Sequence, residues 1–121
     1  MFLLAIAVAG AIGAPARYLV DGFVQARSDR ATPLGTLIVN VSGSFILGLI
    51  TGFALSHAFR GVPRATLAIG FCGAYTTFST FAYESVRLLE TGERGAAAQN
   101  VVLSLLVPTL AAAAGLALAS I

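Results

Sequence analysis

Long uncharged stretches alternate with short clusters of charged residues along this chain. Between and around three charged clusters, the chain runs uncharged for 16, 29, 19 and 27 residues. A helix that crosses a membrane needs roughly 20 predominantly apolar residues. The pattern therefore predicts one transmembrane domain over residues 1–121, built from four transmembrane helices at about residues 2–23, 34–57, 65–89 and 96–119.

The composition places these helices in a bilayer rather than in the core of a soluble protein. Of the 121 residues, 58% are hydrophobic and only 10% are charged, and the mean hydropathy is +0.92. So few charges cannot cover a water-soluble globule of this size. The expected fold class is an all-α membrane protein whose four helices use essentially the whole chain. No separate catalytic domain is expected.

The charged and metal-binding residues point away from several classes of function. Seven arginines, no lysine and five acidic residues give a net charge of +2 and are scattered along the chain, which leaves no basic face for nucleic acid. Cys72 and His57 are the single cysteine and the single histidine, too few for an intrachain disulfide or a cluster of metal ligands. The sequence has no P-loop for a nucleotide, and an enzyme is not expected.

The arginines give the predicted helices only a weak preference for one orientation across the membrane. With four spans, both termini lie on one side of the membrane. The loop on that side carries two arginines and the opposite side carries four, with Arg17 close to them: Arg60 and Arg64 against Arg27, Arg30, Arg87 and Arg94. Arginines in short loops favour the cytoplasmic side. Either the richer side faces the cytoplasm, or the chain inserts in both orientations and pairs antiparallel with a second copy.

Small and polar residues form a stripe along one face of the second predicted helix. They recur at four-residue spacing, as Thr36, Asn40, Ser44, Gly48 and Gly52. The G-x-x-x-G step at the end of the stripe allows close approach of backbones, either within the chain or between chains. The Asn40 amide needs hydrogen-bond partners, because an unsatisfied polar group in hydrocarbon costs several kcal/mol. It either holds helices together or serves a polar ligand.

The third predicted helix has an unusual centre for a helix that faces lipid. Four hydroxyl residues and two phenylalanines occupy six consecutive positions: Thr76, Thr77, Phe78, Ser79, Thr80 and Phe81. Hydroxyl groups donate hydrogen bonds, and the edges of phenyl rings are electropositive. Such a combination can line a path for an anion. Aromatic residues at helical spacing are also typical of an ordinary core.

Residues 10–18, 33–45 and 70–84 read GAIGAPARY, PLGTLIVNVSGSF and GFCGAYTTFSTFAYE. These three segments resemble the Fluc (CrcB-type) family of fluoride channels. The resemblance covers the first three predicted helices, and its most specific element is the third segment. The fourth helix is generic apolar sequence.

The resemblance implies an antiparallel, dual-topology homodimer in the inner membrane of a bacterial cell, with two fluoride pores built from residues of both chains. By position, Phe78, Phe81 and Asn40 match residues that line or approach the family's pores. Arg17 matches an arginine near the pore vestibule.

Further pore residues follow from the same resemblance. Ser79, Thr80 and Glu84 fall on the family's polar track beside the phenylalanines, and the hydroxyl of Thr77 is counted with them. Ser104 is the candidate on the fourth helix. One turn before it, an asparagine stands near the position where similar channels often carry an aromatic hydroxyl, which is a departure from the family.

A structural sodium ion at the dimer centre is also implied. The family breaks its third helix near the midpoint, where backbone carbonyls from both chains hold the ion. The matching positions here are Gly73 and Thr76. Carbonyls of unwound helices coordinate sodium in other membrane proteins, so the third helix is expected to be broken.

The function that follows is a passive channel that exports cytoplasmic fluoride and protects the cell from its toxicity. Stripping an ion of water costs on the order of 20 kcal/mol, and amide, hydroxyl and ring-edge donors can replace that water. Two rivals stay open. A small multidrug transporter needs an embedded carboxylate, for which Asp21 and Glu84 are the candidates. A non-transporting assembly subunit would use its polar residues only to join helices.

Overall fold

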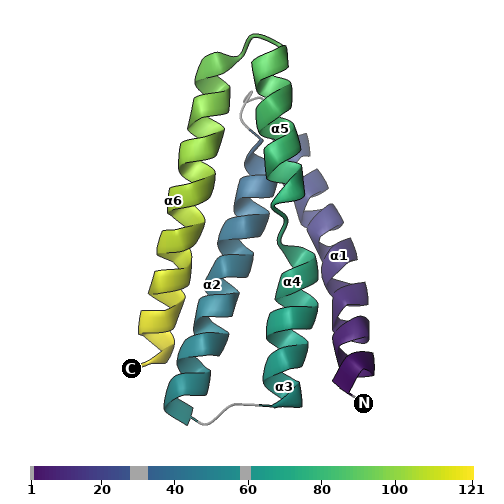
Figure 1. Cartoon of the computed structure of the whole chain (residues 1–121), viewed down its shortest axis with the longest axis vertical. Helices are drawn as coiled ribbons and strands as arrows, with labels where there is room; N and C mark the ends of the chain where they lie inside the picture. Colours follow the sequence, from purple (N-terminus) through teal and green to yellow (C-terminus); the bar gives the residue numbers. More distant parts are fainter. Residues whose placement is uncertain (1, 28–32, 58–60) are drawn as a thin grey trace.

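The computed structural model describes residues 2–27, 33–57 and 61–121, and every regular element in these ranges is helical. In chain order the elements are α1 (Phe2–Ala26), α2 (Leu34–His57), α3 (Val62–Ala65), η1 (Thr66–Cys72), α4 (Gly73–Tyr75), α5 (Ser79–Glu90) and α6 (Arg94–Ala119). η1 is a π-helical stretch that continues α3 and leads directly into α4. The helices form an elongated bundle, and α1 begins at the same end where α6 finishes (Figure 1).

Three helices in the described ranges are long and apolar enough to cross a membrane. They are α1, α2 over Leu34–Ser56, and α6. Their outer faces carry large apolar side chains that the chain itself does not cover, as with Leu3 at 77% exposed and Leu110 at 67%. An apolar surface of this extent is typical of contact with lipid or another protein. The helical fold supports the prediction of an all-α membrane protein.

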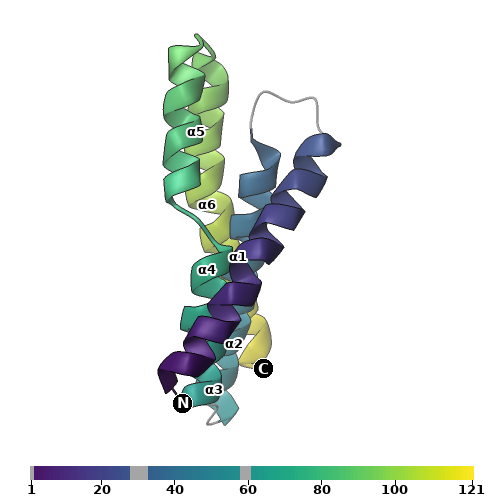
Figure 2. The same ribbon diagram turned by 90° about the vertical axis from the view of Figure 1, so that its right-hand side faces the viewer.

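The third predicted helix, at residues 65–89, was expected to be broken, and no continuous helix spans that range. The chain leaves the helical conformation at residues 76–78, where Thr76 ends α4 with φ −82° and ψ 160°, an extended conformation. α5 then begins at Ser79. Figure 2 shows the non-helical segment that separates α4 from α5. Each piece alone is shorter than the roughly 20 residues that a spanning helix needs.

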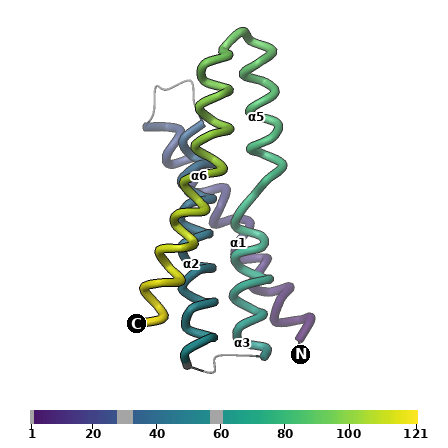
Figure 3. The backbone as a smooth tube through the Cα atoms, turned by 60° about the vertical axis from the view of Figure 1, so that its left-hand side comes forward, coloured from purple at the N-terminus to yellow at the C-terminus, as the bar shows by residue number. Residues whose placement is uncertain are grey.

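α2 and α6 pack together along much of their length (Figure 3). Glycines allow this approach. An ideal Cβ atom at Gly48 would collide with the Ala112 carbonyl oxygen, and one at Gly115 would collide with the Phe45 carbonyl oxygen. Gly52 likewise faces α6. The G-x-x-x-G step is therefore used within the chain, which is one of the two arrangements that the sequence left open.

α1 packs against η1 and α4 in the same way. An ideal Cβ atom at Gly13 would lie 2.6 Å from the Phe71 carbonyl oxygen, and one at Gly70 would lie 2.8 Å from the Ile6 carbonyl oxygen. Seen from the side, α1 crosses the other helices obliquely (Figure 2). The first part of the interrupted helix thus packs against α1, whereas α5 packs against α6.

Two of the arginines used to judge orientation, Arg30 and Arg60, lie outside the described residues. The turn between α5 and α6 lies at one end of the bundle, and α3 lies at the other (Figure 1). Arg87 and Arg94 therefore sit toward the opposite end from Arg64.

Replacing Gly48 with alanine is expected to destabilise the protein, because the added methyl group collides with the α6 backbone. Overpacking of this kind costs about 1–3 kcal/mol. Thermal unfolding in detergent should show a lower midpoint for Gly48→Ala. Gly22→Ala is the matched control, since nothing lies within 4 Å of the Cβ position at this helical glycine. Equal midpoints for the two variants would contradict the packing described for α2 and α6.

Candidate functional site

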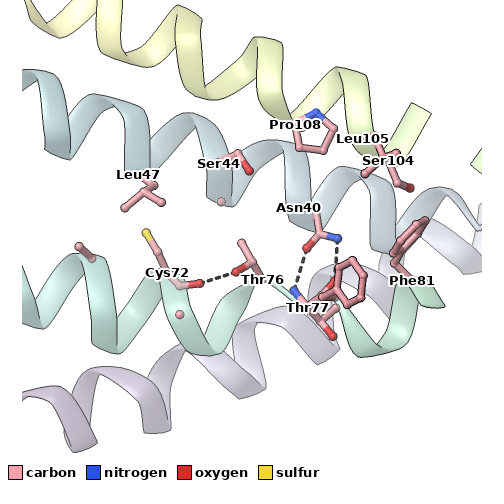
Figure 4. Close-up of a pocket in the computed structure, with 14 residues that line it drawn as sticks. Asn40, Ser44, Leu47, Cys72, Thr76, Thr77, Phe81, Ser104, Leu105 and Pro108 are labelled. Carbon is pink, nitrogen blue, oxygen red and sulfur yellow. Dashed lines mark hydrogen bonds between the residues drawn. The ribbon is translucent and has the colours of Figure 1, made fainter. Parts of the chain in front are cut away.

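A cavity of about 280 Å³ lies beside the interruption in the third helix. Figure 4 shows that its walls come from α2, from the helical pieces on both sides of the interruption, and from α6. Seven of the predicted pore and sodium residues line it: Asn40, Gly73, Thr76, Thr77, Phe78, Phe81 and Ser104. The fold thus brings residues that are far apart in the sequence to one place.

The Asn40 side chain is bound to the backbone of Thr77 through two reciprocal hydrogen bonds. Its Nδ2 donates to the Thr77 carbonyl oxygen at 2.8 Å, and the Thr77 backbone N–H donates to its Oδ1 at 2.8 Å (Figure 4). The amide therefore takes the place of a helical neighbour for both backbone polar groups of Thr77. Nδ2 carries a second N–H, which these two hydrogen bonds do not use.

The same bonds leave a carbonyl of α4 without its helical partner. In a continuous helix, the Thr77 N–H would donate to the Gly73 carbonyl, four residues earlier. Here that N–H donates to Asn40 instead. The Thr76 hydroxyl donates to the Cys72 carbonyl at 2.8 Å. Gly73 and Thr76, the predicted sodium positions, thus flank the place where the helical hydrogen bonds stop.

The Thr77 hydroxyl organises the start of α5. The Thr80 backbone N–H donates to Thr77 Oγ1 at 3.2 Å, and Thr77 Oγ1 donates to Thr80 Oγ1 at 3.1 Å. Ser79 Oγ lies 3.3 Å from the same oxygen. Because the first N–H groups of a helix lack intrahelical partners, Thr77 supplies one of the missing acceptors.

Phe78 and Phe81 meet edge to face at the cavity. Their ring centroids are 5.3 Å apart, and their planes make an angle of 64°. Phe81 is half-buried, whereas Phe78 is 73% exposed. An edge-to-face pair points the electropositive rim of one ring at the electronegative face of the other. The exposed ring leaves part of this site open at the surface of the single chain.

A hydrogen-bonded chain that the sequence did not predict supports Phe81 from α6. Ser104 donates to Asn100 Oδ1 at 3.4 Å, and Asn100 Nδ2 donates to Ser85 Oγ at 2.8 Å. Ser85 in turn donates to the Phe81 carbonyl at 2.8 Å. Asn100, the departure from the family pattern, is only 2% exposed. Its amide therefore links α5 to α6.

A second cavity of about 210 Å³ lies toward the end of the bundle where α1 meets α2. Arg17, Asp21, Thr36 and Thr80 line it together with Thr77, which also lines the first cavity. Thr77 therefore stands between the two cavities.

The remaining two predicted pore residues, Ser79 and Glu84, line neither of these cavities. Glu84 is half-buried on α5, next to Thr36 and within electrostatic reach of Asp21. Ser79 is exposed at the start of α5.

Comparison with known protein families matches residues 4–116 to the family described as CrcB-like protein, Camphor Resistance (CrcB). The chain belongs to this family. The match covers all the helices that form the two cavities. The predicted family resemblance is confirmed.

Curated relatives of this CrcB-family chain carry a functional name. A fluoride-specific ion channel FluC from Syntrophotalea carbinolica is 47% identical over 120 residues, which cover 98% of each chain. One from Geobacter sulfurreducens is 52% identical over 103 residues, covering 84% of this chain and 83% of the relative. A fluoride-specific ion channel FluC 1 from Leifsonia xyli subsp. xyli is 48% identical over 97 residues, 80% of this chain and 71% of the relative.

Asn40→Ala should cost more stability than the loss of an ordinary side-chain hydrogen bond. The substitution leaves the Thr77 N–H and carbonyl without the partners described above, at about 1–3 kcal/mol for each group. Unfolding in detergent would measure this loss. Thr51→Ala is the control, because Thr51 also lies on α2 but donates only to the Leu47 carbonyl of its own helix. The role of Asn40 is contradicted if both variants unfold at the same temperature.

Proposed function

We propose that this protein is a fluoride-selective passive channel that exports cytoplasmic fluoride and so protects the cell from fluoride toxicity. The observation that carries the proposal is the cavity beside the interrupted helix, where Asn40, Ser104 and the phenylalanine pair come together. The proposal is supported by the family to which the chain belongs and by similar proteins that are named fluoride-specific ion channels. Conduction makes and breaks no covalent bond, so the protein is not an enzyme.

The proposed pore replaces the water around fluoride with weak donors. Moving an ion into a low-dielectric medium costs on the order of 20 kcal/mol before compensation. Hydroxyl groups, the remaining N–H of Asn40 and the edges of Phe78 and Phe81 supply that compensation. An ion must also leave, which requires that no single site bind too tightly. Neutral donors at the first cavity meet both requirements.

A passive pore suffices for export. Hydrofluoric acid crosses membranes as a neutral molecule and dissociates at cytoplasmic pH, which traps fluoride inside. A membrane potential that is negative inside then drives the anion outward, by about 2.3 kcal/mol per 100 mV for one charge. We place the protein in the inner membrane of a bacterial cell, where such a potential exists.

The functional unit is proposed to be an antiparallel homodimer with two pores. Two observations support this arrangement: the weak arginine bias between the two sides and the 73% exposure of Phe78 at the cavity. A second, inverted copy would cover the exposed ring and complete the wall of each pore. Arg17 and Glu84 are assigned to the vestibule and the polar track of the pore, together with Ser79, Thr77 and Thr80.

A structural sodium ion is proposed at the centre of this dimer, held by backbone carbonyls of Gly73 and Thr76 from both chains. The chemistry of the interruption suits it, because the Gly73 carbonyl has lost its helical donor. Carbonyl oxygens of an interrupted helix are suitable ligands for sodium. The ion would fix the two copies to each other at the point where each helix is broken.

Purified protein in liposomes should release fluoride and retain chloride once valinomycin carries compensating potassium. Ion-selective electrodes measure both. Phe81→Ile removes the electropositive ring edge, and a loss of about 1.4 kcal/mol in stabilisation slows release about tenfold. Phe23→Ile is the control, since Phe23 is 60% exposed on α1 and lines neither polar cavity. Release of neither ion from folded protein would contradict the channel and favour proton-coupled cation transport.

Dual topology predicts that both ends of the bundle are reached from outside the cell. Single cysteines at Val62 and Thr91, exposed at opposite ends of the bundle, would be introduced into a Cys72→Ala background. A membrane-impermeant maleimide applied to intact cells should label both variants to a similar partial extent. Complete labelling of one variant and none of the other would establish a single orientation.

A further inference from the structure

The chain of hydrogen bonds between α5 and α6 runs in one direction only. The Phe81 carbonyl can only accept, so Ser85 Oγ donates to it at 2.8 Å. Ser85 has then used its one proton and accepts from Asn100 at 2.8 Å, which places Nδ2 on that side of the amide. Oδ1 therefore faces Ser104, whose hydroxyl donates to it at 3.4 Å. Each group in the chain fixes the role of the next.

This direction determines what Ser104 offers to the first cavity. A serine hydroxyl has one proton and two lone pairs, and here the proton is donated to Asn100. Ser104 lines the cavity, whereas Asn100 is 2% exposed and does not line it (Figure 4). The hydroxyl therefore has only lone pairs left for the cavity. Because an anion needs a donor, Ser104 can bind one only after it releases Asn100.

The bond from Ser104 to Asn100 is one that an ion can take over. Two other hydroxyls on α6, those of Thr109 and Ser120, donate to carbonyls of their own helix at 2.6 and 2.7 Å. Ser104 instead donates to a side chain, and its bond is longer, at 3.4 Å. Hydrogen bonds between oxygens are usually 2.5–3.0 Å long. The Ser104 proton is therefore held less firmly than its neighbours.

Releasing Asn100 has a cost that arises outside the cavity. Its buried Oδ1 would lose the bond from Ser104, and a buried acceptor without a partner is unfavourable. The amide cannot turn over to find a new bond, because Ser85 holds Nδ2 and the Phe81 carbonyl holds Ser85. This cost lowers the affinity of Ser104 for any anion that takes its proton.

We propose that Asn100 is a positioning residue that weakens the binding of fluoride at Ser104 by competing for the hydroxyl hydrogen bond. Fluoride takes this bond as it arrives and returns it to Asn100 as it leaves. The proton stays on Ser104 throughout, and no covalent bond changes. Conduction needs sites that an ion can leave, and Asn100 provides this property without touching the ion. The inference rests on the proposed fluoride channel.

A residue that only joined two helices would not need the second bond. The bond from Asn100 to Ser85 already links α6 to α5. The bond from Ser104 connects residues one turn apart on α6, so it adds nothing to the contact between the helices. Its effect is on the hydroxyl that faces the cavity.

NMR can follow the Asn100 amide directly, because the chain contains only two asparagines, Asn40 and Asn100. Protein labelled with carbon-13 in the asparagine carboxamide is placed in lipid nanodiscs and titrated with sodium fluoride or sodium chloride at constant ionic strength. Fluoride should shift the Asn100 signal until the shift saturates, and chloride should not. The signal is assigned with Asn100→Leu, which removes it, or with Ser85→Ala, which breaks the bond to Nδ2.

Ser104→Ala should change the starting position of the Asn100 signal and abolish its response to fluoride. Thr109→Ala is the matched control, because the exposed Thr109 hydroxyl donates to the Leu105 carbonyl of its own helix. This variant should keep the response of the wild type. A response that persists in Ser104→Ala would overturn the inference.

Asn100→Leu tests the competition itself. Leucine accepts no hydrogen bond, so the Ser104 hydroxyl is free to donate to fluoride. Fluoride currents across planar bilayers should reach half-saturation at a concentration about fivefold lower than in the wild type, the factor that one net hydrogen bond supplies. A purely structural role would reduce the current and leave this concentration unchanged. If Asn100→Leu does not fold, Ser85→Ala frees the amide to turn and donate to Ser104, and the same decrease is expected.

Fluoride release from liposomes, measured on the same preparations, separates this inference from the proposed function. Release of fluoride combined with an Asn100 signal that does not move would overturn the inference and leave the channel in place. An unchanged half-saturating concentration in a folded Asn100→Leu or Ser85→Ala channel would overturn it as well. If folded wild-type protein releases no fluoride, the channel is contradicted and the role of Asn100 falls with it.

Discussion

A bilayer offers no water to an exposed peptide group, and this constraint governs the interruption at residues 76–78. Every N–H and carbonyl freed where α4 ends must find a partner in the protein. Asn40 meets this need for one residue, because its amide binds both the N–H and the carbonyl of Thr77. Hydroxyl groups satisfy others locally, with Thr77 accepting from the Thr80 N–H at the start of α5. The polar side chains of this segment are therefore needed to bond its backbone groups, and they also offer hydrogen bonds to an ion.

α2 connects this polar centre to the rest of the bundle. Its glycines lie against the backbone of α6, which brings the two helices close enough for Ser104 and Asn40 to line the same cavity. The face with Asn40 meets the interruption, and its first turn meets Asp21. One helix thus sets the positions of three others. A change in how α2 packs against α6 would move the site as a whole.

Much of the helical content could be predicted from the sequence, because uncharged stretches of membrane-spanning length are a strong signal. The polar and aromatic residues of the third stretch were also predicted to matter, and the fold brings most of them to one cavity. The partners of these residues were not predictable. Sequence spacing gives no sign that Asn40 would bind the backbone of Thr77, or that η1 would widen into a π-helix, since both depend on contacts with distant segments.

The network of Asn100 and the group around Asp21 illustrate a second limit. A departure from a family motif identifies a position as different but does not name its partner, and Asn100 bonds to Ser85 on another helix. In the sequence, Asp21 stood out only as one of two candidate carboxylates for a rival transporter. Its closeness to Thr36 and Glu84 arises from the crossing of three helices, which no local pattern encodes.

The position of Thr77 between the two cavities has a mechanical consequence. Its buried side chain is the shared wall of spaces of about 280 and 210 Å³, and its backbone is held by Asn40. Its hydroxyl is held as well, by the Thr80 N–H and the hydroxyl groups of Ser79 and Thr80. The side chain therefore cannot rotate without breaking the hydrogen bonds that start α5. The partition between the two spaces is thus tied to the first turn of α5, and a change at that helix end would act on both spaces at once.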